Sequence, residues 1–599
     1  MNKKNLSLAI LLFCMSLSLG AIAQQDKAVV KKLKGLDKYI ERAMKDWKVP
    51  GVALVIVKDG KVAYQKGYGY RDVAKKLLVT PQTQFAIGSS SKAFTATTVC
   101  QLVDDGILEL DKPLKEYLPD FKLYNDYVTN HMTARDLLCH RSGLPRHDLA
   151  WYGTDFTREE LYKNLHHLEA TQDFREGWQY QNLMFMTAGY LVGKLTGKPW
   201  EKNVEERIFK PLGMTHSNLS VEALKKTENR AIGYNEEDEK IKAIPYRNID
   251  VVGPAGSINS TVEDMAKWII LQLNKGKYQK KKVVSEGMVA QMHRPHTIVP
   301  GNANKEQFYT NYGLGWFVTS YRGQLLVHHG GNIDGFSAMV ALLPQDKMGL
   351  VILTNKNATP ITNIIRNKVV DRLKGLSDVD WSKKGLKRYK KALEAAKKAG
   401  EDSEIKPVAG TKPSHALKDY EGKYKHPAYG QITITLKKNQ GLTAQYHTFD
   451  LPLLHFHYDV FKVDEGQFKG VKLQFGLNAK GEVQSISSEL QAGVDPIKFE
   501  REQEAAALSE SSLEKYLGEY DLRGATIKVW KRKGTLMVTL PGQPDWELVA
   551  LKKAHTFDFK DKRLKGYQMI FKIDSAKNKE KAIEAAFHQP NGIFTAKRK

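Results

Sequence analysis

The sequence predicts an α+β fold: an antiparallel sheet flanked by helices, with a helical subdomain, followed by two small all-β barrel-like modules. Three observations carry this prediction. An early strand hairpin, a helical middle and a late run of strands imply one antiparallel sheet with helices packed on it. Short alternating strands then follow a charged segment, and their opening repeats, since residues 417–424 match residues 513–520.

The chain begins with the features of a cleavable secretory signal. Two lysines precede an apolar run over residues 6–19, and Ala-Ile-Ala at residues 21–23 forms an A-x-A cleavage site. We expect cleavage after Ala23 and a periplasmic or secreted mature chain. No later stretch offers the roughly 18 consecutive apolar residues of a membrane span, so we expect no transmembrane segment in the mature chain.

The first domain, residues 24–378, is predicted element by element. Residues 28–47 have helical periodicity, and residues 51–57 and 62–68 form two strands across an Asp-Gly turn, a strong hairpin signal. Helices are expected after Ser89, after the capping residue Thr133 and before the Thr-Gly at residue 197. Further helices are expected over residues 157–169 and 262–273, the second after a Gly/Pro loop at residues 252–258.

Four strand-like runs end this domain, at residues 312–318, 324–328, 336–343 and 349–355. The composition then changes. We expect a charged helical linker over residues 379–412, a first β module over 413–503 and a second over 504–599.

Charge and cysteine content exclude several function classes. The formal net charge is +25, but the lysines are spread along the chain and no nucleic-acid recognition signature accompanies them, so we expect no nucleic-acid partner. No Cys/His cluster or nucleotide-binding loop occurs, so we expect no metal and no cofactor. Cys100 and Cys139 remain after cleavage, and we interpret them as small core residues, with a disulfide between them as the alternative.

Ser89 and Lys92 are the first candidate catalytic pair. They lie at i and i+3 of a predicted helix start, where a neutral amine can accept the proton of a serine hydroxyl. Ser-x-x-Lys also occurs at Ser403 and Ser512. These two lie in the charged linker and at the first turn of a β module, a context that favours Ser89.

Two further motifs supply the groups that such a pair needs. A Tyr-x-Asn occurs at Tyr162, Tyr180 and Tyr309. Of the three tyrosines, only Tyr180, which pairs with Asn182, is expected in a loop just before an apolar helix. A side chain in such a loop can point into a cleft. The second motif is the His-His-Gly-Gly run at residues 328–331, which comprises His328, His329, Gly330 and Gly331. It ends a predicted strand, and its glycines let a substrate lie along the backbone.

These motifs together resemble the serine β-lactamase and penicillin-binding protein superfamily, in its class C-like branch of D,D-carboxypeptidases, D-aminopeptidases and esterases. The resemblance is carried by residues 85–95 and 106–113, by residues 133–145 and by the Tyr-x-Asn and His-x-Gly motifs, in the family's order. The β modules resemble domains often appended to such hydrolases. The resemblance implies the β-lactamase/D,D-peptidase fold.

The resemblance also implies residue roles. Ser89 would be acylated, Lys92 would activate it, and Tyr180 would serve the leaving group and the deacylating water as general base or acid. Asn182 would hold substrate and the lysine amine, and the N–H groups of Ser89 and Gly331 would form an oxyanion hole. His328 would bind a substrate carboxylate in place of the family's lysine, although His329 beside it leaves the register open.

We therefore expect a serine hydrolase that cleaves an amide or ester through an acyl-enzyme. A D-amino-acid-containing peptide, which could derive from peptidoglycan, is one candidate substrate. A histidine at residue 328 is more typical of peptidases and esterases than of β-lactamases. Esterase or β-lactamase activity is the enzymatic alternative. A penicillin-binding sensor or cell-wall-binding protein without efficient turnover is the alternative of another class.

Overall fold

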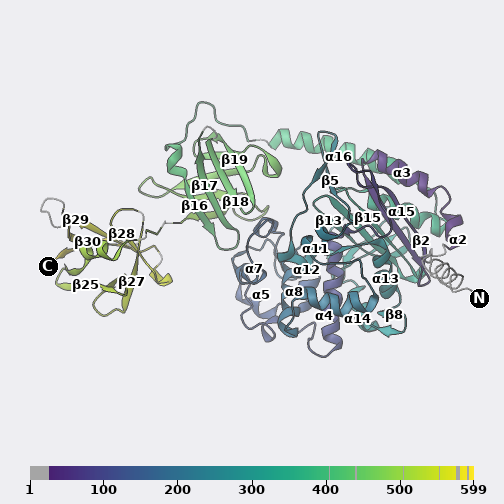
Figure 1. The fold of residues 1–599 in the computed structure, drawn as a ribbon, viewed down its shortest axis with the longest axis horizontal. Coiled ribbons are helices and arrows are strands. Elements are labelled where there is room, and N and C mark those ends of the chain that lie inside the picture. The colour runs from purple at the N-terminus through teal and green to yellow at the C-terminus, as the bar shows by residue number, and fades with distance from the viewer. Residues whose placement is uncertain are drawn as a thin grey trace, which may run out of the picture. The chain divides into compact units, whose positions relative to one another are not determined.

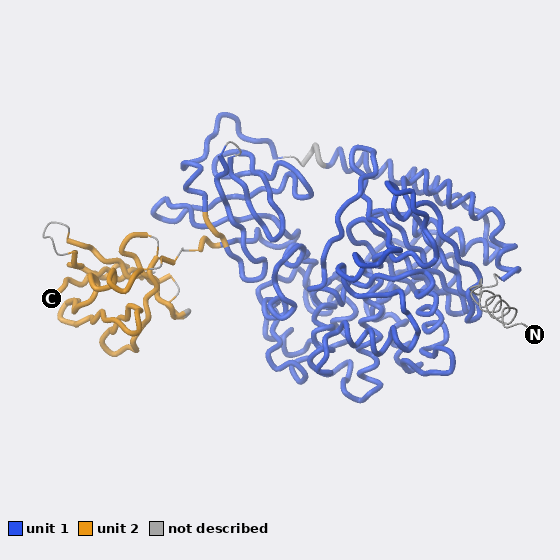
Figure 2. Tube along the Cα trace, viewed as in Figure 1, with its two compact units in different colours: residues 1–421, 425–499 blue, residues 422–424, 500–599 orange. Residues whose placement is uncertain are grey.

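The computed structural model describes residues 26–403, 405–438, 441–502, 505–506, 508–551, 553–564, 566–574, 580–589 and 592–599. The predicted signal at residues 1–23 lies outside them. The chain divides into two compact units, shown in Figure 2: residues 1–421 with 425–499, and residues 422–424 with 500–599. Among the described residues, no helix is both long and apolar enough to cross a membrane.

A nine-stranded antiparallel sheet forms the centre of the first domain (Figure 1). Its order is β10-β11-β12-β13-β14-β15-β1-β2-β3. The predicted hairpin is confirmed, because β1 and β2 pair across Asp59 and Gly60, both at positive φ as a tight hairpin turn requires. The strands run over Gly51–Lys58 (β1), Lys61–Asp72 (β2), Leu77–Leu78 (β3), Thr297–Val299 (β10), Thr310–Tyr312 (β11), Phe317–Tyr321 (β12), Gln324–Ile333 (β13), Phe336–Leu343 (β14) and Met348–Thr354 (β15).

Each face of this sheet is covered by helices. Val52, Leu54 and Ile56 alternate along β1 into one core, which α3 (Leu36–Asp46) and α15 (Ile361–Lys374) cover. The opposite face contacts α13 (Val262–Leu273). A strand with two buried faces reads as a continuous apolar run, which explains the sequence of residues 51–57.

The helical subdomain surrounds a buried helix, α4 (Lys92–Asp104). Every side chain from Lys92 to Leu102 is buried, so the helix shows no polar face. Phe94 stacks on Trp268 of α13 with ring centroids 3.8 Å apart. The helices that contact α4 include α8 (Asn182–Thr196), α9 (Trp200–Val204), α12 (Gly253–Gly256) and α14 (Glu286–Met292). The subdomain also contains α5 (Asp126–His131), α6 (Ala134–Leu138) and α7 (Arg158–Asn164).

Two local predictions need correction. The run at 312–318 is two strands, β11 and β12, because Gly313 and Gly315 form a turn between them; Gly315 has φ +76° and packs on the Lys92 carbonyl. The Gly/Pro loop at residues 252–258 contains the short helix α12. Cys100 and Cys139 are both buried and free.

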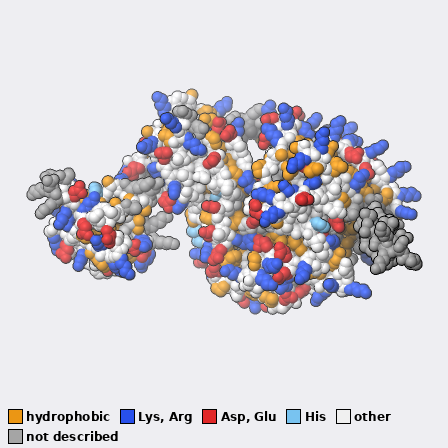
Figure 3. Space-filling model, in the orientation of Figure 1, with side chains coloured by type: hydrophobic (Ala, Val, Ile, Leu, Met, Phe, Trp, Pro, Cys, Tyr) orange, Lys and Arg blue, Asp and Glu red, His pale blue; other side chains and the backbone are white. Residues whose placement is uncertain are grey.

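Both β modules are closed, eight-stranded antiparallel barrels. The first comprises β16 to β23, from Gly422 to Arg501, and the second β24 to β31, from Gly518 to Arg598. Helix α16 (Trp381–Ser403) precedes them, and its first two residues, Trp381 and Ser382, are buried, with the Trp381 indole donating to Asp371 of α15. In the part of the chain drawn in Figure 3, Lys and Arg side chains are interleaved with Asp and Glu over the visible face.

The strands of the first barrel run over Gly422–His426 (β16), Gly430–Lys437 (β17), Gly441–Tyr446 (β18), Phe449–His457 (β19), Val460–Val463 (β20), Lys472–Leu477 (β21), Val483–Ser488 (β22) and Ile497–Arg501 (β23). Those of the second run over Gly518–Leu522 (β24), Ala525–Arg532 (β25), Thr535–Thr539 (β26), Asp545–Ala550 (β27), Thr556–Phe559 (β28), Gln568–Ile573 (β29), Ala582–Gln589 (β30) and Gly592–Arg598 (β31).

Candidate active site

Ser89 lies in a 3₁₀ turn, Gly88–Ser91, that leads directly into α4. Gly88 before it has φ +51°, a conformation that glycine adopts without strain, and this brings the turn against the Asn332 backbone. The turn opens into a cavity of about 270 Å³. The residues that line it include Ser89, Arg146, Asp148, Tyr152, Asn182 and Asp334.

Lys92 lies one turn further along and reaches back to the serine. Its Nζ is 3.1 Å from Ser89 Oγ, 2.8 Å from Asn182 Oδ1 and 2.8 Å from the Ala255 carbonyl oxygen. A neutral amine has two N–H groups, and the Asn182 and Ala255 oxygens can accept both. The lone pair then remains for the Ser89 hydroxyl proton, so the geometry suits a general base.

The electrostatic environment of Lys92 favours this neutral form. The side chain is 0% exposed, and burial lowers the pKa of Lys92 well below its ordinary value. The positive charge of Arg146 lowers this pKa further, and the negative charge of Asp148 opposes both effects.

Asp148 fixes the orientation of Asn182. The Asn182 Nδ2 group donates to Asp148 Oδ1 at 3.0 Å, which leaves the amide oxygen facing Lys92. Asp148 itself accepts from the Trp151 indole and from Arg146 Nε, at 3.1 and 2.6 Å. The carboxylate therefore joins the loop at residues 145–153 to the N-terminus of α8.

Tyr180 lies in the loop before α8, and its ring faces Lys92 and Arg146. Lys92 Nζ lies 4.7 Å from the centre of its ring and the Arg146 guanidinium 5.0 Å. Burial raises the pKa of the Tyr180 phenol above its ordinary value, and an interaction with the Ser89 hydroxyl opposes this shift. The phenol is thus protonated at neutral pH and suited to donate or relay a proton.

Gly331 packs against the turn that carries the nucleophile. A Cβ atom at Gly331 would lie 1.9 Å from the Ile87 carbonyl oxygen and 3.0 Å from Ser89 N, so only glycine fits. A Cβ at Gly330 would come no closer than 3.6 Å to its neighbours. The structure therefore brings Gly331 beside the Ser89 N–H group, as the predicted oxyanion hole requires.

The two histidines of β13 face different sides. His328 pairs across the sheet with Ala341, whose side chain belongs to the core under α15. Burial lowers the pKa of His328 well below its ordinary value, and the charge of Arg366 in that helix adds to the effect. His329 faces the other way, and its Nε2 lies 2.8 Å from the Tyr312 hydroxyl. Burial lowers the pKa of His329 to about 3, and the charge of Lys92 adds to that effect.

Neither imidazole is among the described residues that line the cavity around Ser89. The position of His328 does not fit the carboxylate-binding role that the resemblance implied. Of the two registers left open, the structure places His329 on the side of Lys92.

The competing motifs lie in different surroundings. Tyr162 is buried in α7 and donates to Asp120, whereas Tyr309 is 77% exposed. Ser512 lies in α17 (Glu510–Leu513), and its hydroxyl contacts Ser509.

Sequence reasoning missed three groups of the site: the Ala255 carbonyl, Asp148 and Arg146. A main-chain oxygen leaves no residue-type signal. A charged pair in a loop becomes informative only when the fold brings it to Asn182 and Lys92.

The chain is similar in sequence to known protein families and proteins. The beta-lactamase family matches residues 36–371, and a family described as a domain of unknown function, DUF3471, matches residues 406–501. The "Unguisins hydrolase ungD'" of Aspergillus campestris is 32% identical over 429 residues, which are 67% of this chain and 78% of that protein. "Protein flp" of Staphylococcus aureus is 30% identical over 344 residues, which are 55% of this chain and 65% of that protein.

A solved structure shows the fold. The octameric penicillin-binding protein homologue from Pyrococcus abyssi superposes with a TM-score of 0.53 at 21% sequence identity, covering 85% of this chain and 98% of that one. At this level of identity the likeness concerns the fold alone.

Proposed function

The chain belongs to the beta-lactamase family of serine hydrolases, and from this membership we propose that it cleaves an amide or ester through an acyl-enzyme on Ser89. The observation that carries this proposal is the fully buried Lys92 amine, which contacts the Ser89 hydroxyl and two fixed acceptors. A buried lysine with a lowered pKa beside a serine is a recognised way to activate that nucleophile.

The acylation step begins when Lys92 Nζ takes the proton of Ser89 Oγ. The oxygen attacks the substrate carbonyl carbon, and the new oxyanion accepts N–H bonds from Ser89 and from the Gly331 backbone. One such donor contributes about 3–4 kcal/mol to transition-state stability. The proton on Lys92 passes to the Tyr180 oxygen while Tyr180 gives its own proton to the leaving nitrogen or oxygen, and the scissile bond breaks.

Deacylation reverses these transfers. A water molecule attacks the acyl carbon while its proton moves toward Tyr180 and Lys92. The bond from the carbonyl carbon to Ser89 Oγ breaks, and the oxygen recovers its proton from Lys92. Because Tyr180 is protonated at neutral pH, it takes part as a proton relay and needs no phenolate form.

We further propose a peptide as the substrate, a D-amino-acid-containing peptide being the first candidate, and a site of action in the periplasm or outside the cell. The Aspergillus relatives are named unguisins hydrolases, and that name supports hydrolysis as the activity. The N-terminal sequence at residues 1–23 supports export.

Turnover assays test this function. Purified enzyme is given p-nitrophenyl butyrate, a chromogenic cephalosporin and an N-acetylated D-Ala-D-Ala peptide, with Ser89→Ala as the matched control. We expect steady turnover of the peptide or the ester that Ser89→Ala abolishes. Equal rates in the two proteins would exclude Ser89, and stoichiometric acylation without turnover would favour a penicillin-binding sensor.

A further inference from the structure

The loop at residues 145–153 has two sides, and one of them forms a wall of the catalytic cavity. Arg146, Asp148, Trp151 and Tyr152 line the same space as Ser89. Through Asp148 this loop orients the Asn182 amide, and through Arg146 it contacts the Tyr180 ring. Its conformation therefore affects the groups around Lys92.

The other side of the loop is bound to the first β barrel. The His147 N–H donates to Gln491 Oε1 at 2.7 Å, and His147 Nδ1 lies 2.7 Å from the Tyr429 hydroxyl. The Tyr446 hydroxyl donates to the Leu149 carbonyl at 2.7 Å. All three partners belong to the barrel.

His147 is the centre of this attachment. It is 0% exposed and has φ +46°, a left-handed conformation that a non-glycine residue adopts only when its surroundings impose it. Its third contact joins Nε2 to the Glu169 carbonyl at 2.8 Å. Because Arg146 and Asp148 flank His147, a change in its backbone would turn both side chains away from the site.

A second attachment lies at the far end of the loop. Phe449 of the barrel stacks on Tyr152 with ring centroids 5.8 Å apart and planes 9° from parallel, and the Arg247 guanidinium lies within 5 Å of both rings. The Tyr152 hydroxyl donates to Asp334 at 2.5 Å. The barrel thus also supports the rim of the cavity at the end of β13.

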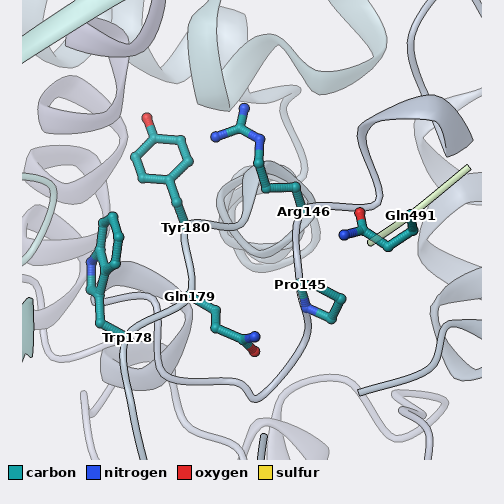
Figure 4. A pocket seen from close by; sticks show the side chains of 6 residues that line it. All are labelled: Pro145, Arg146, Trp178, Gln179, Tyr180 and Gln491. Carbon is teal, nitrogen blue, oxygen red and sulfur yellow. The ribbon is translucent and has the colours of Figure 1, made fainter. Parts of the chain in front are cut away.

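The barrel itself lines a second cavity beside Tyr180. This space of about 450 Å³ is shown in Figure 4, where the Tyr180 phenol and the Arg146 guanidinium extend to the same side and Gln491 enters from a separate segment. Pro145, Trp178 and Gln179 complete the lining. Since Tyr180 is proposed to protonate the leaving group, this cavity is where the leaving group would lie.

We propose that the first β barrel is part of the active site: it holds the loop at residues 145–153 in its catalytic conformation, and with Gln491 it forms one wall of the leaving-group subsite. The half-exposed Arg146 guanidinium and the rings of Trp178 and Tyr180 suit a planar group with an oxygen acceptor, such as a peptide unit or its terminal carboxylate. This inference rests on the proposed function.

The test uses variants of the full chain that remove single contacts between barrel and loop. Tyr429→Phe, Tyr446→Phe and Gln491→Ala each delete one partner. Tyr458→Phe is the matched control, because Tyr458 is an exposed tyrosine in another turn of the same barrel. The probe is a fluorophosphonate, and its rate of reaction with Ser89 is measured against pH, alongside the thermal unfolding of each protein.

We expect acylation about tenfold slower or more in the three variants, because misplacing a positioned group by about 1 Å costs up to roughly 100-fold. We also expect the acid limb of the pH profile to move to higher pH, because a loosened loop admits water to Lys92 and its pKa rises toward the ordinary value. Tyr458→Phe should match the wild type in both respects.

Wild-type rates and an unmoved acid limb in all three variants would overturn the inference and leave the proposed function standing. Slower acylation with a lower unfolding temperature but an unmoved acid limb would also overturn it, since the barrel would then only stabilise the fold. Gln491→Ala alters a loop side chain outside the barrel core. This variant therefore tests the role of the barrel even where a tyrosine variant unfolds. A wild type that does not react would instead refute the proposed function.

Discussion

In the proposed mechanism, the surroundings of Lys92 decide whether Ser89 can react. In water its amine would be charged at neutral pH and could not accept a proton. In the structure it is fully buried and offered only neutral acceptors, so deprotonation relieves the cost of burying a charge. The negative charge of Asp148 favours the protonated lysine, but Asp148 is hydrogen-bonded to the far side of the Asn182 amide. Asp148 is also paired with Arg146, which carries the opposite charge.

The pH profile of ester hydrolysis follows from these shifts. In the proposed mechanism the neutral lysine is the active form, so kcat/KM should rise with pH through the lowered pKa of Lys92 and reach its plateau well below the ordinary pKa of lysine. The raised pKa of Tyr180 keeps the phenol protonated across that plateau. A stopped-flow pH series on p-nitrophenyl butyrate measures the rise of kcat/KM with pH and the extent of its plateau.

Lys92→Arg is the control for that series. Arginine does not deprotonate in proteins, so activity should fall by about 10²–10⁴ and the rise with pH should disappear. An acid limb that survives in Lys92→Arg would assign it to another group.

The sequence singles out Ser89, Lys92, Tyr180 and Asn182, which the structure brings close together, because each belongs to a short motif with a chemical reason for its spacing. It could not choose between His328 and His329, since alternation along a strand fixes the period but not which face is catalytic.

At the scale of elements, the approach of β13 to the turn before α4 forms the proposed oxyanion hole. Gly331→Ala should abolish acylation, because its methyl group would overlap the Ile87 carbonyl and push the strand from Ser89. Gly330→Ala is the matched substitution one residue earlier and should lose far less activity, since it meets only ordinary contacts. Comparable losses in the two variants, measured as fluorophosphonate labelling rates, would contradict this account of the strand.

Helix α6 carries a second element-level prediction. Asp136 is fully buried, forms a capping box with Thr133 and accepts hydrogen bonds from Arg141 and Arg175. Asp136→Ala should lower the free energy of unfolding by about 3 kcal/mol, measured by urea denaturation of the hydrolase domain. The exposed Asp111, paired with Arg135, is the control, and Asp111→Ala should cost about 1 kcal/mol or less. Equal costs would refute the role of burial.

Elements were predicted where a local signal exists. The Asp-Gly hairpin, the Thr133 cap and the buried strand at residues 336–343 each carry one. The turn at residues 313–316 and helix α12 have no such local sequence signal, because both depend on glycines whose conformation is set by distant packing. The Gly315 turn fits against the Lys92 carbonyl, a contact that spans more than 200 residues of sequence.

For the whole molecule, the sequence predicts two related β modules. It does not indicate which of them contributes residues to the cavities beside Ser89 and Tyr180. All described residues that line the two cavities beside Ser89 and Tyr180 fall between Gly88 and Gln491. A chain that ends at residue 503 should therefore acylate as fast as the full chain. A large loss of labelling rate in that truncated protein, with its unfolding temperature preserved, would show that the second barrel contributes to the site.

The mass of the intact protein after reaction with a fluorophosphonate, followed by peptide mapping, tests whether Ser89 is the nucleophile. We expect the wild type to form one adduct per chain, located on Ser89. Ser89→Ala should form none, and Lys92→Arg should form it much more slowly. An adduct that maps to another serine, or a Ser89→Ala protein that gains the same mass at the same rate, would contradict the assignment of Ser89 as the nucleophile.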